Sequence, residues 1–478
     1  MLRTAAQLRS EAIRIWRAGL DAVGSERLIR QHVHIDRNWL AIGDNLTGGD
    51  LTGNDSTISP IDLRRIGRIA VVGAGKAGAG MAAALESVLG PRLIEDKKLV
   101  GWVNVPADCV RPLERIHLHA ARPAGINEPT AEGVAGALEI LRIVGGLSTE
   151  DLCLCLISGG GSALLPAPPP EISLADKLAV TRHLAAAGAD ITELNTVRKQ
   201  LTRIKGGGLL RACRAARLVS LIISDVLGDP LDLIASGPTV ADRSTPAAAL
   251  KILSRFDPGQ TAIPTAVYDY LRHQPVPSVS GKALAAGGER ELQVDNFILA
   301  NNATAVDAAG QEAVRLGYAH AMTAATRPEG FVEPIGRHMA DMAIAMRRGP
   351  GPDCLISGGE GVVRLLESSR RGLGGRNQQL ALAALIQLEN SASRDAADIA
   401  MVSAGTDGED GPTDAAGAIV DADVFARSRQ LGLNAEEYLQ RNDAYRFFEP
   451  AGGLLKTGPT HTNVGDLRVV TVSQNHLR

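Results

Sequence analysis

The chain has 478 residues, of which 45% are hydrophobic and 22% are charged. These values are typical of a globular protein with about two to four domains, and they exclude a disordered chain. The 50 basic and 53 acidic residues give a net charge of −3, so no overall positive field is present to hold nucleic acid. Glycine is abundant, with 52 residues, whereas aromatic residues make up only 3% of the chain, which also disfavours base stacking.

Cysteine usage and apolar patterning predict the compartment. Two of the five cysteines, Cys153 and Cys155, are two apart in one apolar run, a poor geometry for a disulfide between them. We therefore expect reduced thiols and a cytoplasmic protein. The N-terminal segment mixes arginines and glutamates through its apolar stripe, unlike a signal peptide, and no apolar run reaches the ~18 residues of a membrane helix.

Apolar residues at helical spacing between Leu8 and Val23 predict an opening helix, and the polar, glycine-rich residues 41–59 predict a loop. Short continuous apolar runs then recur, each ending in Gly, Ser, Asp or Asn. Such runs favour strands buried on both faces of a mainly parallel sheet covered by helices, with ligands at the carboxyl ends of the strands. The runs are RIAVVGAGKAG, DLCLCLISGGGS, RLVSLIISDVLGD, NFILANN, DCLISGGE and IAMVSAGTDG.

A domain boundary is predicted near residue 265. Residues 244–288 contain no strong strand and include the segment PVPSVSGKALAAGG, which is rich in proline, glycine and serine. Such composition is typical of a linker or loop. The predicted domains are residues 1–265 and 266–478.

The first strand–loop–helix unit contains Gly73-Ala74-Gly75-Lys76-Ala77-Gly78, a match to G-x-G-x-x-G. Its amides and the following helix N-terminus could hold a phosphate. A dinucleotide site also needs an acid at the end of the next strand, but Glu95 and Asp96 precede that strand. Lys76 inside the loop therefore favours direct contact with a phosphate or carboxylate. The alternative is a tight turn with a solvated lysine.

The second loop, Ser158-Gly159-Gly160-Gly161-Ser162, also follows an apolar run. Three consecutive glycines can expose amides that form an anion-binding nest, and the two serines can add hydroxyl donors. A flexible turn explains the same residues. The motif G-x-S-x-G does not occur around Ser158, so a serine hydrolase is poorly supported.

A basic segment follows, containing Asn195, Arg198 and Lys205. Arg198 and Lys205 are seven residues apart and would lie on one helical face, where two fixed cations suit a small anion or a nucleotide phosphate. The alternative is a solvated basic face.

Three aspartates are candidates for binding a metal or accepting a proton. Asp225 and Asp229 follow an apolar run, and Asp407 lies in the segment GTDG. Mg²⁺ shared with a phosphate usually needs only one or two carboxylates. An Asx turn or a helix cap would also account for Asp225 and Asp229. The histidines lack companions at zinc-binding spacing.

The C-terminal half supplies two further polar loops. Arg376 is flanked by glycines and by amide side chains that include Asn377, which suits a guanidinium that grips a carboxylate or phosphate through two hydrogen bonds. Near the C-terminus, Thr457, Gly458 and Thr460 belong to the segment TGPT, another candidate anion-binding loop.

Together these segments resemble the glycerate 2-kinase family, whose C-terminal part is called the MOFRL domain and whose members have often been labelled hydroxypyruvate reductase. The resemblance runs from about residue 5 to residue 474. It is carried by GAGKA, LISGGGSALLPAP, LNTVRKQLTRIKGGGL, ISDVLGDPLDLIASGPT, LISGGE, GLGGRNQQ, SAGTDGEDGPTDAAGAIVD and LLKTGPTHTNVGDL.

The resemblance implies an α/β fold of two dissimilar three-layer α/β/α domains with mainly parallel sheets and an active site in the interdomain cleft. The N-terminal domain (1–265) would be Rossmann-like and the C-terminal domain (266–478) of MOFRL type. It implies ATP and Mg²⁺ as co-substrates, D-glycerate phosphorylated at its 2-hydroxyl, and Lys76 and Arg376 as the catalytic pair. The expected partner is a small hydroxy acid, not nucleic acid or a membrane, and a homodimer is compatible with the sequence.

The sequence departs from the family pattern at three places. Gln379 stands where glutamate is common, His461 stands where glycine is common, and residues 121–130 read ARPAGINEPT. The first change is expected to remove a negative charge near the active site, and the second to add bulk in a phosphate-type loop. Two alternative functions stay open: an NAD(P)H-dependent hydroxypyruvate reductase, and a catalytically altered homologue that binds a small hydroxy acid.

Overall fold

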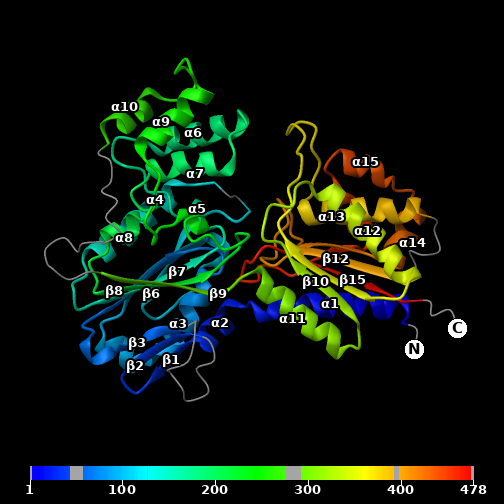
Figure 1. Cartoon of the computed structure of the whole chain (residues 1–478), viewed down its shortest axis with the longest axis horizontal. Helices are drawn as coiled ribbons and strands as arrows, with labels where there is room; N and C mark the ends of the chain where they lie inside the picture. The colour runs from blue at the N-terminus through cyan, green and yellow to red at the C-terminus, as the bar shows by residue number, and fades with distance from the viewer. Residues whose placement is uncertain (1–2, 44–56, 126–127, 275–291, 392–397, 475–478) are drawn as a thin grey trace. The chain divides into compact units, whose positions relative to one another are not determined.

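The computed structural model describes residues 3–43, 57–125, 128–274, 292–391 and 398–474. The chain forms two compact units, shown in Figure 1. Unit 1 contains Met1–Gly24, Ser224–Gly228 and Ala300–Arg478, and unit 2 contains Ser25–Ile223 and Asp229–Leu299. None of the helices among the described residues is long and apolar enough to span a membrane.

The main sheet of unit 2 has the strand order β6 (Ile116–Arg122), β5 (Val100–Pro106), β4 (Ile69–Ala74), β7 (Leu152–Ser158), β8 (Arg217–Ile223), β9 (Gln293–Ala300). The pairs from β6 to β8 are all parallel. The Gln293 amide donates to the Ala216 carbonyl and the Ser224 amide to the Ala300 carbonyl, so β8 and β9 run in the same direction. Strands β4, β7 and β8 are buried along their whole length, which accounts for their continuous apolar sequence.

Helices cover both faces of this sheet. Helix α3 (Gly78–Asp96) lies on one face and α4 (Ala131–Gly145) on the other (Figure 1). A separate apolar cluster holds α6 (Leu174–Ala186), α7 (Ile191–Gln200), α9 (Pro246–Phe256) and α10 (Thr265–His273) together. The other elements of unit 2 are α2 (Ser25–His32), α5 (Gly161–Leu164), α8 (Gly208–Ala212) and an antiparallel sheet of β1 (Val33–Asp36), β2 (Trp39–Gly43) and β3 (Thr57–Asp62).

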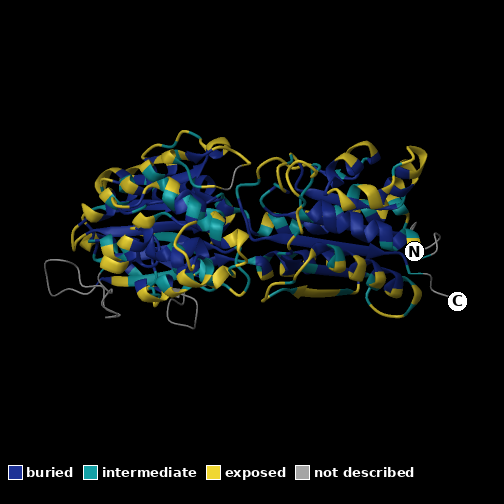
Figure 2. Ribbon diagram, turned by 90° about the horizontal axis from the view of Figure 1, so that it is seen from above, coloured by how far each residue is buried: buried dark blue, intermediate teal, exposed yellow. Residues whose placement is uncertain are grey.

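The sheet of unit 1 has the order β10 (His320–Ala324), β11 (Cys354–Gly359), β15 (Asp466–Val472), β12 (Ile399–Gly405), β13 (Gly417–Val420), β14 (Leu454–Leu455). Alternate residues of its strands enter two different apolar clusters. Ile356 and Val469 pack with α1 (Ala5–Ala22) and α11 (Asn302–Arg315). Leu355 and Val470 pack on the other face in a cluster with five helices. These are α12 (Val332–Arg348), α13 (Arg376–Asn390), α14 (Ala422–Gln430), α15 (Ala435–Gln440) and α16 (Ala444–Ala451). Figure 2 shows central strands coloured as buried beneath helices whose outer sides are exposed.

The predicted α/β fold with layered helices is confirmed, but the strand directions of unit 1 differ from the prediction. Among the described strand pairs of this sheet, β10–β11 is parallel, and the pairs β11–β15, β12–β15, β12–β13 and β13–β14 are antiparallel. A continuous apolar run reports burial on both faces, and helices that cover both faces of an antiparallel sheet produce the same pattern. Apolar runs therefore could not distinguish the two sheet types.

The extent of each unit also differs from the predicted boundary near residue 265. Helix α10 packs on α9, and β9 completes the sheet of unit 2, so this unit extends to Leu299. The predicted opening helix is present as α1, and it packs against β15 and β12 of unit 1. The segment PVPSVSGKALAAGG and most of the predicted loop 41–59 lie outside the described residues.

Candidate active site

In unit 2, the loop that follows β4 packs against the loop that follows β7. The Lys76 amide donates to the Gly159 carbonyl (2.9 Å), and the Ala77 amide donates to the Ser158 hydroxyl (3.0 Å). Gly75 has φ +147°, and a Cβ there would collide with the Ser158 side chain, so this position requires glycine. The structure thus brings the first two predicted loops side by side at the carboxyl ends of neighbouring parallel strands.

Two cationic side chains lie beside the second loop. A Cβ built on Gly160 would be 3.4 Å from Lys76 Cγ and 3.9 Å from Arg122 Nη2. Gly160 has φ +76°, a left-handed conformation that favours glycine. Gly73, Gly161 and Gly78 complete this region, and α3 begins at Gly78. Its first amides therefore carry the partial positive charge of a helix N-terminus next to Lys76.

The acids that a dinucleotide site would need are at the other end of α3. Glu95 and Asp96 are the last two residues of this helix and precede β5, as predicted from the sequence. Among the described residues, the end of β5 carries Asn104, Val105 and Pro106. The G-x-G-x-x-G match therefore lacks the acid that holds a ribose in a dinucleotide site.

A second group of cations surrounds Ser162. Arg198 Nη2 donates to the Ser162 hydroxyl (2.7 Å), and Lys205 Nζ donates to its hydroxyl (2.8 Å) and its carbonyl (2.6 Å). Helix α7 ends at Gln200, so Arg198 and Lys205 do not share a helical face as predicted; the turn after α7 brings Lys205 back toward Ser162. Asn195 is buried on α7.

Lys177 on α6 belongs to this group and was not among the predicted site residues. Its side chain is 3% exposed. Burial, together with the positive charge of Arg198, lowers the pKa of Lys177 to about 7. Burial and the charges of Lys177 and Arg198 also lower the pKa of Lys205. Lys177 shares an apolar helix face with Val180 and Leu184, and a lysine at an apolar position of a helix was the one sequence signal for it.

In unit 1, Arg376 is held by carboxylates of its own unit. Its Nε and Nη2 bind Asp466 (2.8–3.1 Å), and its Nη1 binds Glu360 (2.7 Å). Burial opposes the charged guanidinium, but the negative charges of Asp466 and Glu360 outweigh it and raise the pKa of Arg376. Asp466 thus fixes the guanidinium at the start of α13, and the grip of Arg376 on a substrate carboxylate or phosphate stays a prediction.

Asn377, the second residue of α13, links Arg376 to a buried acid. Its amide and that of Gln378 donate to the Asp410 carboxylate (3.0 and 2.8 Å), and its side chain donates to Asp466 (2.9 Å). Burial raises the pKa of Asp410 to about 7, against the effect of the two backbone hydrogen bonds. Asp410, Asp466 and Glu360 were absent from the predicted site residues, because their contacts join segments far apart in the sequence.

The loop of Asp407 packs against the TGPT loop in unit 1. The Thr460 amide donates to the Asp407 carbonyl (3.3 Å) and its hydroxyl to the Thr406 carbonyl (2.6 Å). The Thr457 hydroxyl bonds to the Gly458 carbonyl (2.8 Å).

The three predicted metal candidates are divided between the units. Asp407 Oδ1 accepts the Glu409 amide (3.0 Å), and Asp225 Oδ2 accepts the Asn463 side chain (2.8 Å), both in unit 1. Asp229 belongs to unit 2 and has φ +54°. The described residues contain no group of three or more His, Cys, Asp or Glu side chains arranged to hold a metal ion.

Two of the three departures from the family pattern, Gln379 and His461, have different surroundings. Gln379 is buried, and its side-chain amide donates to the Leu439 carbonyl (2.9 Å) and to Glu333 (3.2 Å). Gln379 therefore links α13 to α12 and α15. The sequence predicts that this residue changes the charge near the active site, whereas its side chain contacts these two helices. His461 adopts φ +56°, a conformation in which glycine costs less than histidine.

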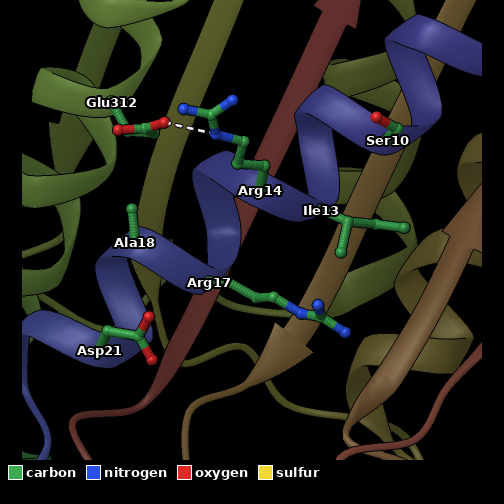
Figure 3. Close-up of a pocket in the computed structure, with 7 residues that line it drawn as sticks. All are labelled: Ser10, Ile13, Arg14, Arg17, Ala18, Asp21 and Glu312. Atoms are coloured by element: carbon green, nitrogen blue, oxygen red, sulfur yellow. Dashed lines mark ion pairs between the residues drawn. The ribbon is translucent and has the colours of Figure 1, made fainter.

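A surface hollow of about 460 Å³ is present elsewhere in unit 1 (Figure 3). It lies along α1, where Arg14 Nε pairs with Glu312 at 2.7 Å. It contains none of the predicted site residues, so we do not assign the active site to it. Its lining residues are Ser10, Ile13, Arg14, Arg17, Ala18, Asp21 and Glu312.

Comparisons with known proteins agree with these motifs. The model "Domain of unknown function (DUF4147)" matches residues 11–272, and the model "MOFRL family" matches residues 353–466. The glycerate kinase of Bos taurus is 38% identical over 83% of this chain and 83% of its own. A protein of Agrobacterium vitis with a provisional hydroxypyruvate reductase name is 38% identical over 87% of this chain and 90% of its own.

The structural comparison extends over nearly the whole chain. The crystal structure of glycerate kinase from Thermotoga maritima has a TM-score of 0.75 and 31% identity, and the match covers 98% of this chain and 100% of that one. Sequence and structural similarity thus coincide over both units, and the chain belongs to the glycerate kinase family.

Proposed function

We propose that this chain transfers the γ-phosphoryl group of ATP to the 2-hydroxyl of D-glycerate, giving 2-phosphoglycerate and ADP. The observation that carries this proposal is the gathering of cations around the two glycine loops of unit 2. Lys76 and Arg122 lie beside Gly160, and Arg198 and Lys205 bind Ser162. Phosphoryl transfer passes through a loose transition state, so positioning and neutralisation of charge provide most of the catalysis.

Lys76 and Arg376 are the proposed catalytic pair. Lys76 would hold a phosphate oxygen beside the amides of its loop and of the α3 N-terminus. Arg376 uses its Nε–H and one N–H of each terminal nitrogen in bonds to Asp466 and Glu360. A guanidinium has five N–H donors, so two make no hydrogen bond to the described residues and would bind the glycerate carboxylate or the transferring phosphoryl group. The fixed orientation of Arg376 lowers the entropy lost on binding.

The carboxylates of unit 1 fit the chemistry of Mg²⁺, a hard cation that prefers oxygen ligands and is commonly shared between one or two carboxylates and substrate phosphates. Asp225 and Asp407 are the proposed ligands, with Asp229 as a further candidate. When bound, Mg²⁺ would neutralise charge on the phosphates. Asp407, whose carbonyl accepts the Thr460 amide, is also the candidate to accept the proton of the glycerate hydroxyl. Cytoplasmic location and a homodimer stay predictions.

The experiment that tests the proposal incubates the purified protein with ATP, Mg²⁺ and D-glycerate and identifies the product by ³¹P NMR. We expect 2-phosphoglycerate. Formation of 3-phosphoglycerate would support glycerate kinase activity but would contradict the 2-hydroxyl as the acceptor. The parallel reaction uses hydroxypyruvate and NADH, because the name of the Agrobacterium vitis relative keeps a reductase as the alternative. NADH oxidation without phosphoglycerate would refute the kinase.

A further inference from the structure

Lys177 is a buried lysine whose ammonium group has no partner in the described part of the chain. It lies on α6, its side chain is 3% exposed, and its Nζ makes no hydrogen bond among the described residues. A buried ammonium group without a hydrogen-bonding partner is strongly unfavourable. The cost falls where a ligand provides the missing partner or where the amine loses its proton.

Two other cations interact electrostatically with Lys177. Helices α6 and α7 lie side by side (Figure 1), and Arg198 on α7 is close enough for its charge to lower the pKa of Lys177. Lys205 is repelled by both residues and is 1% exposed. We call Lys177, Arg198 and Lys205 the cation trio.

The carboxylates of the same region are engaged elsewhere. Asp232 and Asp242 pair with Lys199 Nζ, at 3.1 and 3.6 Å. Within the described residues no ion pair joins the cation trio to a carboxylate; Arg198 and Lys205 instead donate to Ser162, a neutral residue. The trio is therefore a set of hydrogen-bond donors that carries an excess of positive charge in a buried setting.

The charge and the hydrogen-bond donors of the cation trio favour a phosphate group over a carboxylate. A phosphate group carries up to two negative charges and presents three acceptor oxygens, so a guanidinium and two ammonium groups can all be satisfied. A carboxylate carries one negative charge and would leave most of the positive charge unbalanced. Ser162, which Arg198 and Lys205 contact, belongs to the SGGGS loop. Another residue of this loop, Gly160, lies beside Lys76, so the trio adjoins the loops of the proposed kinase site.

We propose that Lys177, together with Arg198 and Lys205, is a phosphate-binding residue that contacts a substrate phosphate group, either of the nucleotide or of phosphoglycerate. The proposal rests on the proposed function for the identity of these ligands. It assigns to Lys177 a direct role in recognition, whereas Gly160 and the other loop residues provide the surrounding backbone.

The experiment compares the wild-type protein with Lys177→Met, which keeps the apolar stem and removes the ammonium group. Titration calorimetry at pH 7 measures Kd for ADP, 2-phosphoglycerate and inorganic phosphate, with D-glycerate as a ligand that has only a carboxylate. We expect Kd to rise at least tenfold for ADP or for 2-phosphoglycerate and to stay within about twofold for D-glycerate. A rise for ADP identifies a nucleotide subsite, and a rise for 2-phosphoglycerate identifies an acceptor subsite.

Two controls keep the result interpretable. Lys251→Met changes an exposed lysine on α9 and should leave all four dissociation constants unchanged. Lys177→Arg keeps the charge and should retain more phosphate affinity than Lys177→Met. If the methionine variant does not fold, Lys177→Gln takes its place in this comparison. Unchanged Kd values for ADP, 2-phosphoglycerate and phosphate in a folded Lys177→Met or Lys177→Gln variant would overturn the proposal.

These binding measurements are independent of turnover. If the wild-type protein binds phosphate ligands through Lys177 but forms no phosphoglycerate, the proposed function fails and the phosphate site stands. If phosphoglycerate forms at the wild-type rate and with the wild-type KM values in Lys177→Met, the phosphate site fails and the proposed function stands.

Discussion

The cation trio of unit 2 and Arg376 of unit 1 are positive charges with opposite surroundings. In unit 2, Lys177 and Lys205 are buried and form no ion pair with any described carboxylate. In unit 1, Arg376 is bound by Asp466 and Glu360 before any ligand arrives. An unpaired buried cation costs stability that a bound anion restores, whereas a paired one is already fixed in orientation. We therefore expect an anion to complete the cation trio, and Arg376 to present hydrogen-bond donors whose orientation is already fixed.

Removal of a partner in unit 1 should have the largest effect on folding. Asp466 is 1% exposed and binds both Arg376 and Asn377. Asp466→Ala leaves the Arg376 guanidinium with Glu360 alone and removes the acceptor of the Asn377 side chain, so we expect a loss of about 3–5 kcal/mol in the unfolding free energy of unit 1. Urea unfolding followed through Trp16, which is buried in this unit, measures it in a background where Trp39 and Trp102 are replaced by Phe.

The surface pair Asp414–Lys456 provides the matched control for this prediction. Asp414 is mostly exposed and lies 2.8 Å from Lys456, so Asp414→Ala should cost far less because water replaces the lost interaction. Equal losses in the Asp466→Ala and Asp414→Ala variants would contradict the view that unit 1 depends on its internal ion pairs.

A change at Lys76 should reduce activity without a comparable loss of stability. Lys76 is partly exposed, and its loop is held by backbone bonds to Gly159 and Ser158 that its side chain does not make. Lys76→Ala should lower kcat about 10²–10³-fold, the usual cost of one transition-state donor, with an unchanged Tm. Lys251→Ala is the exposed control. A rate within a factor of two of the wild type would remove Lys76 from the catalytic pair.

The parts of the structure that the sequence predicts are those encoded by neighbouring residues. The loops after β4 and β7 and the position of Glu95 and Asp96 follow from apolar runs and glycines that are adjacent in the chain. The antiparallel strand β15 is absent from the predicted elements, because DLRVVTV reads as the tail of a motif and its partners β11 and β12 are distant in sequence.

The missed site residues share this cause. Asp466 lies 90 residues from Arg376, and Lys177 is 21 residues from Arg198 in a different helix. No local pattern specifies which carboxylate meets which cation, since that choice depends on the packing of the whole unit. Arg376 was predicted from its flanking glycines, but the partners that fix it required the structure.

The pH dependence of stability should have opposite signs in the two units. Asp410 keeps its proton in the folded state up to about pH 7, whereas the unfolded chain releases it near pH 3.8, so unit 1 loses stability as pH rises between these values. Lys177 loses its proton near pH 7 in the folded state but near pH 10.5 when unfolded, so unit 2 gains stability as pH rises across that window. Each slope is at most about 1.4 kcal/mol per pH unit.

Hydrogen exchange monitored by mass spectrometry resolves the two units in one sample. Asp410→Asn should reduce the change of stability with pH in unit 1 between about pH 3.8 and pH 7. Lys177→Met should reduce the change of stability with pH in unit 2 between about pH 7 and pH 10.5. The comparison between the units fails if either variant retains the wild-type slope in its own unit.

Restoring the residue common in the family at position 379 should destabilise unit 1. The Gln379 amide donates to the Leu439 carbonyl and to Glu333, and a carboxylate can make neither bond. Gln379→Glu should therefore cost about 1–3 kcal/mol, while kcat and KM stay unchanged because the side chain serves helix packing. A second change, Glu333→Gln, should recover part of the stability. A faster reaction in Gln379→Glu would show that this position influences the active site after all.

The smallest expected effect lies at His461, in the loop that packs against Asp407. Its φ of +56° costs a side-chain-bearing residue about 1 kcal/mol relative to glycine. His461→Ala removes the ring but retains the backbone cost, so the difference in unfolding free energy between His461→Gly and His461→Ala isolates that cost. We expect the glycine variant to be more stable by about 1 kcal/mol when Trp16 reports unfolding. Equal stability of the two variants would mean that the backbone relaxes around residue 461. The hydrogen bonds of Thr460 to Asp407 and Thr406 would then not hold the TGPT segment in a fixed conformation.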